Sequence, residues 1–245
     1  MLANTFPRQR TWPTLAWTGA GAVALIAAQI LGVIAYVFGI HLTHAGQFLS
    51  TYDILRNSRT ILGSTVLSTA AVILFLWGLT RIRTRDVPKY LAFCWPRRRE
   101  FIVSMIAFIL FMVLETLLSH WLETSSDMKF MQELVASARA ANAIPFAAVA
   151  LVLAAPVGEE LAFRGFLYRT LELKFGGIAA IVVTALGWAA LHVQYSLIGI
   201  LVVLAGGLLL GAIRRYSGSL YLTMLMHALW NGAALAGAML MMPKA

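Results

Sequence analysis

The sequence predicts an all-α protein, a polytopic membrane bundle of about seven transmembrane helices. Of its 245 residues 60% are hydrophobic and 12% charged, and the mean hydropathy is +0.82. A soluble domain carries about 25% charged residues, and no globular core could bury so much apolar surface. Soluble enzymes, disordered regulators and collagen-like fibres are therefore excluded. The chain is interpreted as one integral membrane domain, 1–245.

Charge-poor stretches close to the roughly 20 residues that cross a bilayer recur along the chain. The first, 15–40, follows Arg8 and Arg10. It is longer than the roughly 7–15-residue apolar core of a secretory signal, so it is interpreted as a retained span. The breaks at 41–60, 81–100 and 123–143 hold no separate domain. The other expected spans are 61–80, 101–122, 144–168, 177–192, 196–213 and 220–242.

The basic residues predict the orientation. The formal net charge is +9, which in a membrane protein reports topology rather than nucleic acid binding, because Lys and Arg gather in short cytoplasmic loops. The break at 81–100 holds seven of them and is placed inside. Alternating spans then put the N-terminus in the cytoplasm and the C-terminus outside, in the plasma (inner) membrane. The basic residues left outside are Arg56, Arg59, Lys129, Arg139 and Lys244.

Ionisable side chains inside a membrane each cost roughly 2.5–3.5 kcal/mol on insertion scales, so each one is a functional candidate. The single cysteine, Cys94, excludes an intrachain disulfide and a Cys-based metal cluster. The candidates within the expected spans are Glu115, His120, Glu159, Glu160, Arg164, His192 and His227, with Asn231 beside the last.

The segment VGEELAFRG, 157–165, holds two adjacent carboxylates. Glu160 and Arg164 are four residues apart and share one helix face, which favours an ion pair. Glu159 lies about 100° around the helix and is left without the arginine, which suits a general base. Pro156 removes a backbone hydrogen bond and could open the helix to water. The alternative is that both glutamates are interfacial and solvated.

His227 and Asn231 are also four residues apart. They could donate two hydrogen bonds to one oxyanion, His227 could bind a metal, or the pair could join helices by hydrogen bonds. The turn at Gly176 predicts a helical hairpin that brings Glu159 and His192 to nearly the same depth. His227 is counted as nearer the cytoplasmic face. A tilted or protruding hairpin, or a sixth helix broken at 206–207, would reconcile the depths, and access from the cytoplasmic half is expected.

The remaining candidates have weaker patterns. Glu115 and His120 are five residues apart and face different ways, so no joint role is expected. Glu115 could pair with Arg59, Arg81 or a polar residue of a lid. His120 is interpreted as interfacial, and His41 and His44 as solvated.

The segments GEELAFRG, WAALH and HALWN lie on three separate apolar stretches within 144–235. Together they resemble the CPBP family of intramembrane proteases, which includes the CAAX prenyl endopeptidases of the Rce1 type and relatives linked to bacteriocin processing and immunity. The first three spans carry no matching motif, so the resemblance implies that 1–143 forms accessory spans and loops and 144–242 the catalytic helical core. The second motif of the family usually begins with Phe, whereas Trp188 stands here and could narrow the cavity.

The resemblance implies hydrolysis of a peptide bond by a glutamate-activated water in a cavity open to the cytoplasm. Glu159 would be the base, His192 its partner, and His227 with Asn231 the stabilisers of the oxyanion. Glu160 and Arg164 would hold the helix. Zinc bound by Glu159, His192 and His227 is possible, although no His-Glu-x-x-His pair is present. The implied substrate is a membrane-associated peptide or protein.

Two other functions remain open at this stage. A proton-coupled transporter could relay protons through Glu159, His192 and His227. Such proteins usually show two related halves, whereas the polar residues here gather in the second half. A scaffold or immunity protein without catalysis is the other alternative, although all the expected polar positions are present.

Overall fold

A computed structural model describes residues 14–43, 57–121 and 125–241. All elements in these ranges are helical, which confirms the all-α prediction. Six helices are long and apolar enough to cross a membrane, and a shorter apolar helix at Gly177–Ala189 makes the seventh. The elements are α1 (Thr14–Thr43), α3 (Ser58–Arg83), α4 (Val87–Leu91), α5 (Arg98–Trp121), α6 (Ser125–Ala140), α7 (Ile144–Ala148), η1 (Val149–Ala154), α8 (Ala155–Glu160), η2 (Leu161–Leu167), α9 (Tyr168–Phe175), α10 (Gly177–Ala189), α11 (Leu197–Ser217) and α12 (Leu220–Met241).

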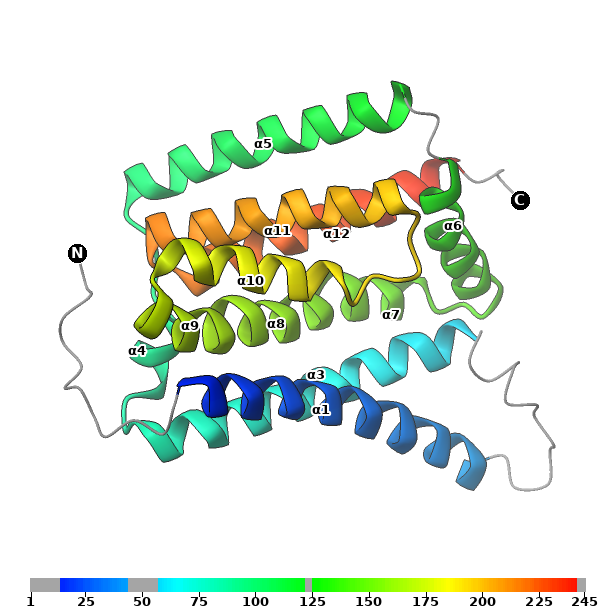
Figure 1. Ribbon diagram of the computed structural model, residues 1–245. Coiled ribbons are helices and arrows are strands. Elements are labelled where there is room, and N and C mark those ends of the chain that lie inside the picture. Colours follow the sequence, from blue (N-terminus) through cyan, green and yellow to red (C-terminus); the bar gives the residue numbers. More distant parts are fainter. Residues whose placement is uncertain (1–13, 44–56, 122–124, 242–245) are drawn as a thin grey trace.

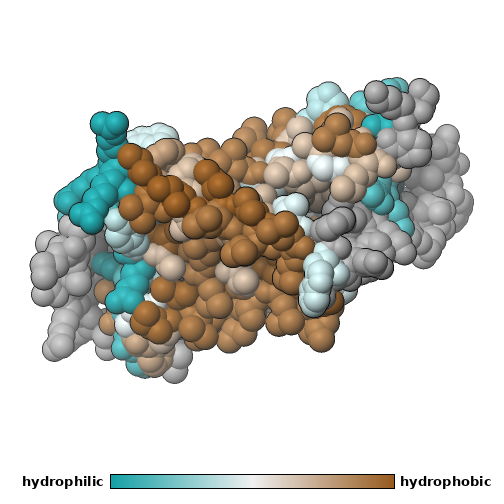
Figure 2. Space-filling view, turned by 90° about the horizontal axis from the view of Figure 1, so that it is seen from above, coloured by the Kyte–Doolittle hydropathy of each residue, from teal (hydrophilic) through white to brown (hydrophobic). Residues whose placement is uncertain are grey.

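The long helices run along one common direction (Figure 1). Figure 2 shows an apolar belt between two polar ends on the face that carries α5. Large apolar side chains of α5 such as Ile106, Leu110 and Leu114 are exposed there. Exposed apolar surface on this scale matches a hydrocarbon surrounding rather than water. The protein is therefore a multi-pass membrane protein.

The fourth span is one continuous rod built of five pieces, α7 to α9, and two of them, η1 and η2, are π-helical. In the first π-helical piece the N–H of Ala155 donates to the carbonyl of Ala150. The following residue, Pro156, has no N–H, so the same pattern leaves the Leu151 carbonyl without its backbone donor. The proline thus leaves this carbonyl to a donor from another helix.

The α9–α10 hairpin turns at Gly176, whose φ of +83° is a conformation that glycine adopts at low cost. Helix α10 has 13 residues, about 20 Å at about 1.5 Å per residue, so it does not cross the roughly 30 Å hydrocarbon core. The predicted span 177–192 is therefore too long, because the helix ends at Ala189. Residues 190–196 form a non-helical loop that leads to α11.

The two ends of the bundle differ in composition. We call the end formed by residues 81–100, 169–177 and 214–219 the basic end, and the end formed by α6 and the loop 190–196 the α6 end (Figure 1). The short helix α4 lies at the basic end. The helix α6 occupies the break 123–143, for which the sequence predicted no helix. Its mean hydropathy is too low for a span, so only its amphipathic pattern could have revealed it.

Helix α1 packs closely along α3, and we predict that one glycine makes this approach possible. A Cβ added at Gly32 would lie 2.6 Å from the backbone nitrogen of Ser68. Because backbone cannot yield as a side chain does, Gly32→Ala should destabilise the protein by about 1–3 kcal/mol. The matched control is Gly19→Ala on the same helix, where an added Cβ meets nothing within 4 Å. Thermal unfolding in detergent should show a lower Tm for the first variant alone, and equal Tm values would contradict this packing.

Candidate functional site

A buried ion pair stands at the centre of the bundle. Glu160 and Arg164 have side chains that are 0% exposed, and Arg164 Nη1 lies 2.8 Å from Glu160 Oε1. Arg164 Nη2 also donates to the carbonyl of Gly207 on α11, at 3.1 Å. The guanidinium lies 4.6 Å from the centre of the Trp188 ring. The pair expected from the spacing on one helix face is thus formed, and it ties the fourth span to α10 and α11.

His227 on α12 is held between the two glutamates. Its Nδ1 donates to Glu160 Oε1 at 3.0 Å, because an ionised carboxylate can only accept. Its Nε2 lies 4.0 Å from Glu159 Oε2, and its side chain is 3% exposed. Because Nδ1 is held by Glu160, Nε2 is the ring nitrogen on the side of Glu159 and the cavity.

Glu159 has a partner that the sequence interpretation did not give it. The indole N–H of Trp188 donates to Glu159 Oε2 at 2.6 Å. The spacing had left Glu159 without the arginine, the resemblance had named His192 as its partner, and Trp188 had been considered as a ring that could narrow the cavity. The signal available was general: a buried tryptophan N–H usually finds an acceptor. The Glu159 side chain is 28% exposed, so it remains open to the cavity.

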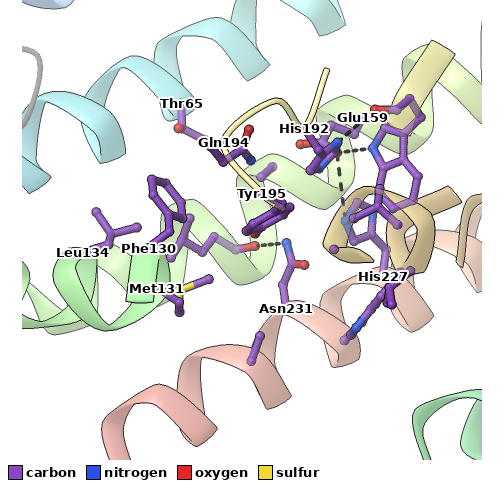
Figure 3. Close-up of a pocket in the computed structure, with 18 of the residues that line it drawn as sticks. Thr65, Phe130, Met131, Leu134, Glu159, His192, Gln194, Tyr195, His227 and Asn231 are labelled. Atoms are coloured by element: carbon purple, nitrogen blue, oxygen red, sulfur yellow. Dashed lines mark hydrogen bonds and ion pairs between the residues drawn. The ribbon is translucent and has the colours of Figure 1, made fainter. Parts of the chain in front are cut away.

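His192 follows α10 and lies beside Trp188. Its Nδ1 donates to the Trp188 carbonyl at 2.9 Å, which leaves Nε2 with the free lone pair in the neutral ring. The His192 ring meets the edge of Trp188 at 5.1 Å between centroids and stacks on Tyr195 at 5.9 Å. The predicted hairpin thus brings Glu159 and His192 to one cavity (Figure 3), although His192 is bonded to Trp188 rather than to Glu159.

Asn231 lies one turn beyond His227 and bonds to the fourth span. Its Nδ2 donates to the Leu151 carbonyl at 2.8 Å, the acceptor that Pro156 leaves open. This is the helix-joining role that the sequence left as an alternative. An amide nitrogen carries two hydrogens, so one remains for a ligand in the cavity that Asn231 also lines.

These side chains stand at the inner end of a cavity of about 360 Å³. Apolar side chains of α6, namely Phe130, Met131 and Leu134, line the part of the cavity farther from Glu159 (Figure 3). Thr65 and Thr69 of α3 line another wall. The sequence interpretation had assigned no part of the site to residues before 144. Residues on α3 could not have been found from the sequence, because nothing in it tells which span packs beside the motif helices.

The cavity runs from Glu159 toward the α6 end, and none of its lining residues belongs to the basic end. Access from the cytoplasmic half therefore conflicts with the predicted cytoplasmic position of the basic loops. The expectation rested on depths counted from the turns. Leu220, at the start of α12, packs against Gly165, eleven residues before the turn at Gly176. The hairpin thus extends beyond the start of α12, which agrees with the protruding hairpin among the alternatives that the sequence left open.

The zinc prediction concerns the side chains of Glu159, His192 and His227. In the part of the chain that the structure describes, no three His, Cys, Asp or Glu side chains form a group that could hold a metal ion. His192 and His227 donate through Nδ1 to the Trp188 carbonyl and to Glu160, which leaves Nε2 of each ring as the atom that could bind a metal. The zinc prediction for Glu159, His192 and His227 therefore stays a prediction.

Glu115 of α5 also lines the cavity. The indole of Trp230 is its hydrogen-bonding neighbour, and neither Arg59 nor Arg81 is seen to pair with it. Arg59 instead donates to the Ala141 carbonyl and Arg81 to the Arg85 carbonyl. The side chains of His41, His44 and His120 lie outside the described part of the chain.

Comparison with protein families agrees with the resemblance seen in the motifs. Residues 141–233 match the family described as type II CAAX prenyl endopeptidase Rce1-like, which confirms the predicted family relationship for this region. The curated proteins gave no match. The solved structures gave none either.

The buried ion pair gives a stability prediction. Arg164→Ala would leave the Glu160 carboxylate buried without its cation, which costs about 3–5 kcal/mol. The control is Arg169→Ala on the same rod, because Arg169 pairs with Glu172 where the two side chains are 12% and 29% exposed, and such a pair contributes about 1 kcal/mol or less. Thermal unfolding in detergent should separate the two variants clearly. Similar losses of Tm would show that the Glu160–Arg164 pair does not stabilise the bundle.

Proposed function

The chain carries an Rce1-like type II CAAX prenyl endopeptidase region at residues 141–233, and from this premise we propose that it is an intramembrane endopeptidase that uses a water activated by Glu159. The observation that supports this most directly is the position of Glu159. Its carboxylate is fixed by Trp188, faces His227, and opens to a cavity large enough for water and a peptide segment.

Glu159 would act as the general base. Trp188 occupies Oε2, so Oε1 remains to accept a proton from water. As the proton moves to Glu159, the water oxygen bonds to the carbonyl carbon of the peptide, and the carbonyl oxygen becomes an oxyanion. The intermediate then collapses, the C–N bond breaks, and the proton held by Glu159 passes to the leaving nitrogen.

The two histidines and the asparagine would support this base. His192 offers a free Nε2 lone pair, because its Nδ1 is fixed on the Trp188 carbonyl, and it can accept a hydrogen bond from the second O–H of the water, which keeps that hydrogen. Asn231 has one amide hydrogen left for the oxyanion. His227 can donate from Nε2 when its ring carries both protons, while Glu160 keeps hold of Nδ1. No step requires a metal ion.

The substrate would be a peptide or protein segment that enters the cavity. The cavity wall combines apolar side chains from α6 with hydroxyl groups from α3 and Tyr195. Such a wall suits an extended apolar segment whose backbone still needs hydrogen-bond partners. No nucleic acid partner is proposed, because the basic residues gather in the loops rather than along the cavity.

The general base gives the direct test. Glu159→Gln should lower the rate of peptide cleavage by about 100-fold or more, since it removes the proton acceptor and keeps the shape. His192→Ala and His227→Ala should also abolish cleavage. The matched control is Glu172→Gln on α9, which is not among the cavity-lining residues. Membranes that contain wild-type or Glu159→Gln protein would be compared by mass spectrometry of new peptide termini.

The outcome separates the proposal from its alternatives. Termini that appear with wild-type and Glu172→Gln protein, but not with Glu159→Gln protein, would support the hydrolase. Identical termini from all three proteins would refute it. Proton-dependent solute uptake that Glu159→Gln abolishes, in vesicles without any cleavage, would favour the transporter.

A further inference from the structure

The distribution of charge gives the orientation of the bundle independently of any function. Of the Lys and Arg positions in the described ranges, eleven lie at the basic end and three at the α6 end (Figure 1). Short basic loops stay in the cytoplasm. The eleven positions at the basic end are Arg81, Arg83, Arg85, Lys89, Arg97, Arg98, Arg99, Arg169, Lys174, Arg214 and Arg215, and the three at the α6 end are Arg59, Lys129 and Arg139.

The cavity is accessible from the α6 end, opposite the basic end. Its outer wall consists of α6 and the loop 190–196, and the Phe130 and Tyr195 rings meet edge to face across them at 6.1 Å. Because α10 ends at Ala189, the loop places non-helical backbone at membrane depth. Such backbone is tolerated where it lines a water-filled cavity. Gln194, which lines the cavity, is itself exposed.

We propose that the active-site cavity opens on the non-cytoplasmic face of the membrane. Its substrate would then be a peptide segment presented there, such as an exported peptide or an outer segment of a membrane protein. The word substrate rests on the proposed endopeptidase function, whereas the side of access does not. A prenylated C-terminus made in the cytoplasm would lie on the wrong side of this bundle.

Thiol labelling from each side of the membrane tests the proposal without any substrate. Cys94 is the single cysteine, is exposed, and lies at the basic end, so the wild-type chain reports that end directly. Two single-cysteine variants on a Cys94→Ser background report the α6 end and the cavity. Ala136→Cys places a thiol on the exposed side of α6, and Ala155→Cys places one in the cavity, one turn before Glu159.

Each protein would be treated with a membrane-impermeant methanethiosulfonate, in intact cells and in inside-out vesicles, and the remaining thiol counted after denaturation. The expected result is at least tenfold faster reaction of Ala136→Cys and Ala155→Cys in intact cells, and of Cys94 in inside-out vesicles. Faster reaction of Ala155→Cys from the same side as Cys94 would overturn the proposal. So would reaction of Cys94 in intact cells, because the basic end would then be outside.

Glu115 carries a second inference on a separate observation. Its carboxylate lines the cavity on α5, within the membrane-spanning part of the helix. Among the described residues it has no ion-pair partner, and Trp230 is its hydrogen-bonding neighbour. A charged side chain in this position is costly unless something compensates for it. The Trp230 ring lies 6.2 Å from Trp188, the donor to Glu159, so Glu115 stands two indoles away from the proposed base.

The geometry points to Glu115 as a subsite for a cationic group of the ligand, a Lys or Arg side chain or a free amine. The cation would supply the ion-pair partner that no described residue gives to Glu115, and it would fix the register of the peptide beside Glu159. This inference rests on the proposed function, because it requires a peptide in the cavity.

A binding measurement keeps this test apart from catalysis. Ten-residue apolar fluorescent peptides with one Lys at each position in turn, and their norleucine counterparts, would be bound to Glu159→Gln protein in detergent. The best Lys peptide should bind at least about tenfold more tightly than its counterpart, roughly 1.4 kcal/mol. Adding Glu115→Gln should remove that preference and leave the norleucine Kd unchanged.

The control for this pair is Glu100→Gln, at the basic end of the same helix, which should keep the preference. Equal Kd values for Lys and norleucine peptides at every position would refute the subsite. Peptide binding with the expected preference, in a wild-type protein that cleaves nothing, would retain the subsite and count against the hydrolase. The two proposals can therefore fail separately.

Discussion

The structure depends on keeping one pair of opposite charges together inside the membrane. Glu160 and Arg164 are fully buried, and either charge alone would be strongly unfavourable there. The guanidinium has further partners, the Gly207 carbonyl and the Trp188 ring, while the carboxylate also accepts from His227. The helices α10, α11 and α12 are thereby fixed to the fourth span around one charge pair. Trp188 and His227, which touch Glu159, are held by the same interactions, so the pair that stabilises the bundle also positions the proposed base.

A second constraint is the missing N–H of Pro156. Within a membrane every backbone carbonyl needs a donor, and the proline leaves the one at Leu151 without a donor from its own rod. Asn231 satisfies it from α12, and Thr69 of α3 similarly donates to the Ala154 carbonyl. The irregular rod therefore gains partners on both sides. The same irregularity that would weaken an isolated helix thus joins the fourth span to its neighbours and brings Asn231 to the cavity.

Much of this could be predicted from the sequence, because lipid makes the rules strict. Span lengths follow from bilayer thickness, and the Glu160–Arg164 pair follows from spacing on one helix. The bond from Trp188 to Glu159 could not be predicted, because it joins residues on two helices whose rotation is set by packing. The helix α6 was missed for another reason: it is amphipathic and too polar to span. The relative depth of His192 and His227 could not be fixed by counting from the turns, because hairpins need not end at one level. The contact of Leu220 with Gly165 agrees with the protruding hairpin, one of the alternatives left open.

Hydrolysis inside a bilayer needs water as much as it needs a base, and the fold indicates how water is admitted. If α10 crossed the full membrane, its last turns would seal Glu159 within apolar side chains. Helix α10 instead ends at Ala189, and the loop that replaces its last turns brings His192, Gln194 and Tyr195 to the cavity. Early termination of one helix thus places the second histidine at the cavity and opens the path that the proposed water would take. The loop lies at the end of the bundle where α10 stops, so the proposed side of access depends on the same truncation.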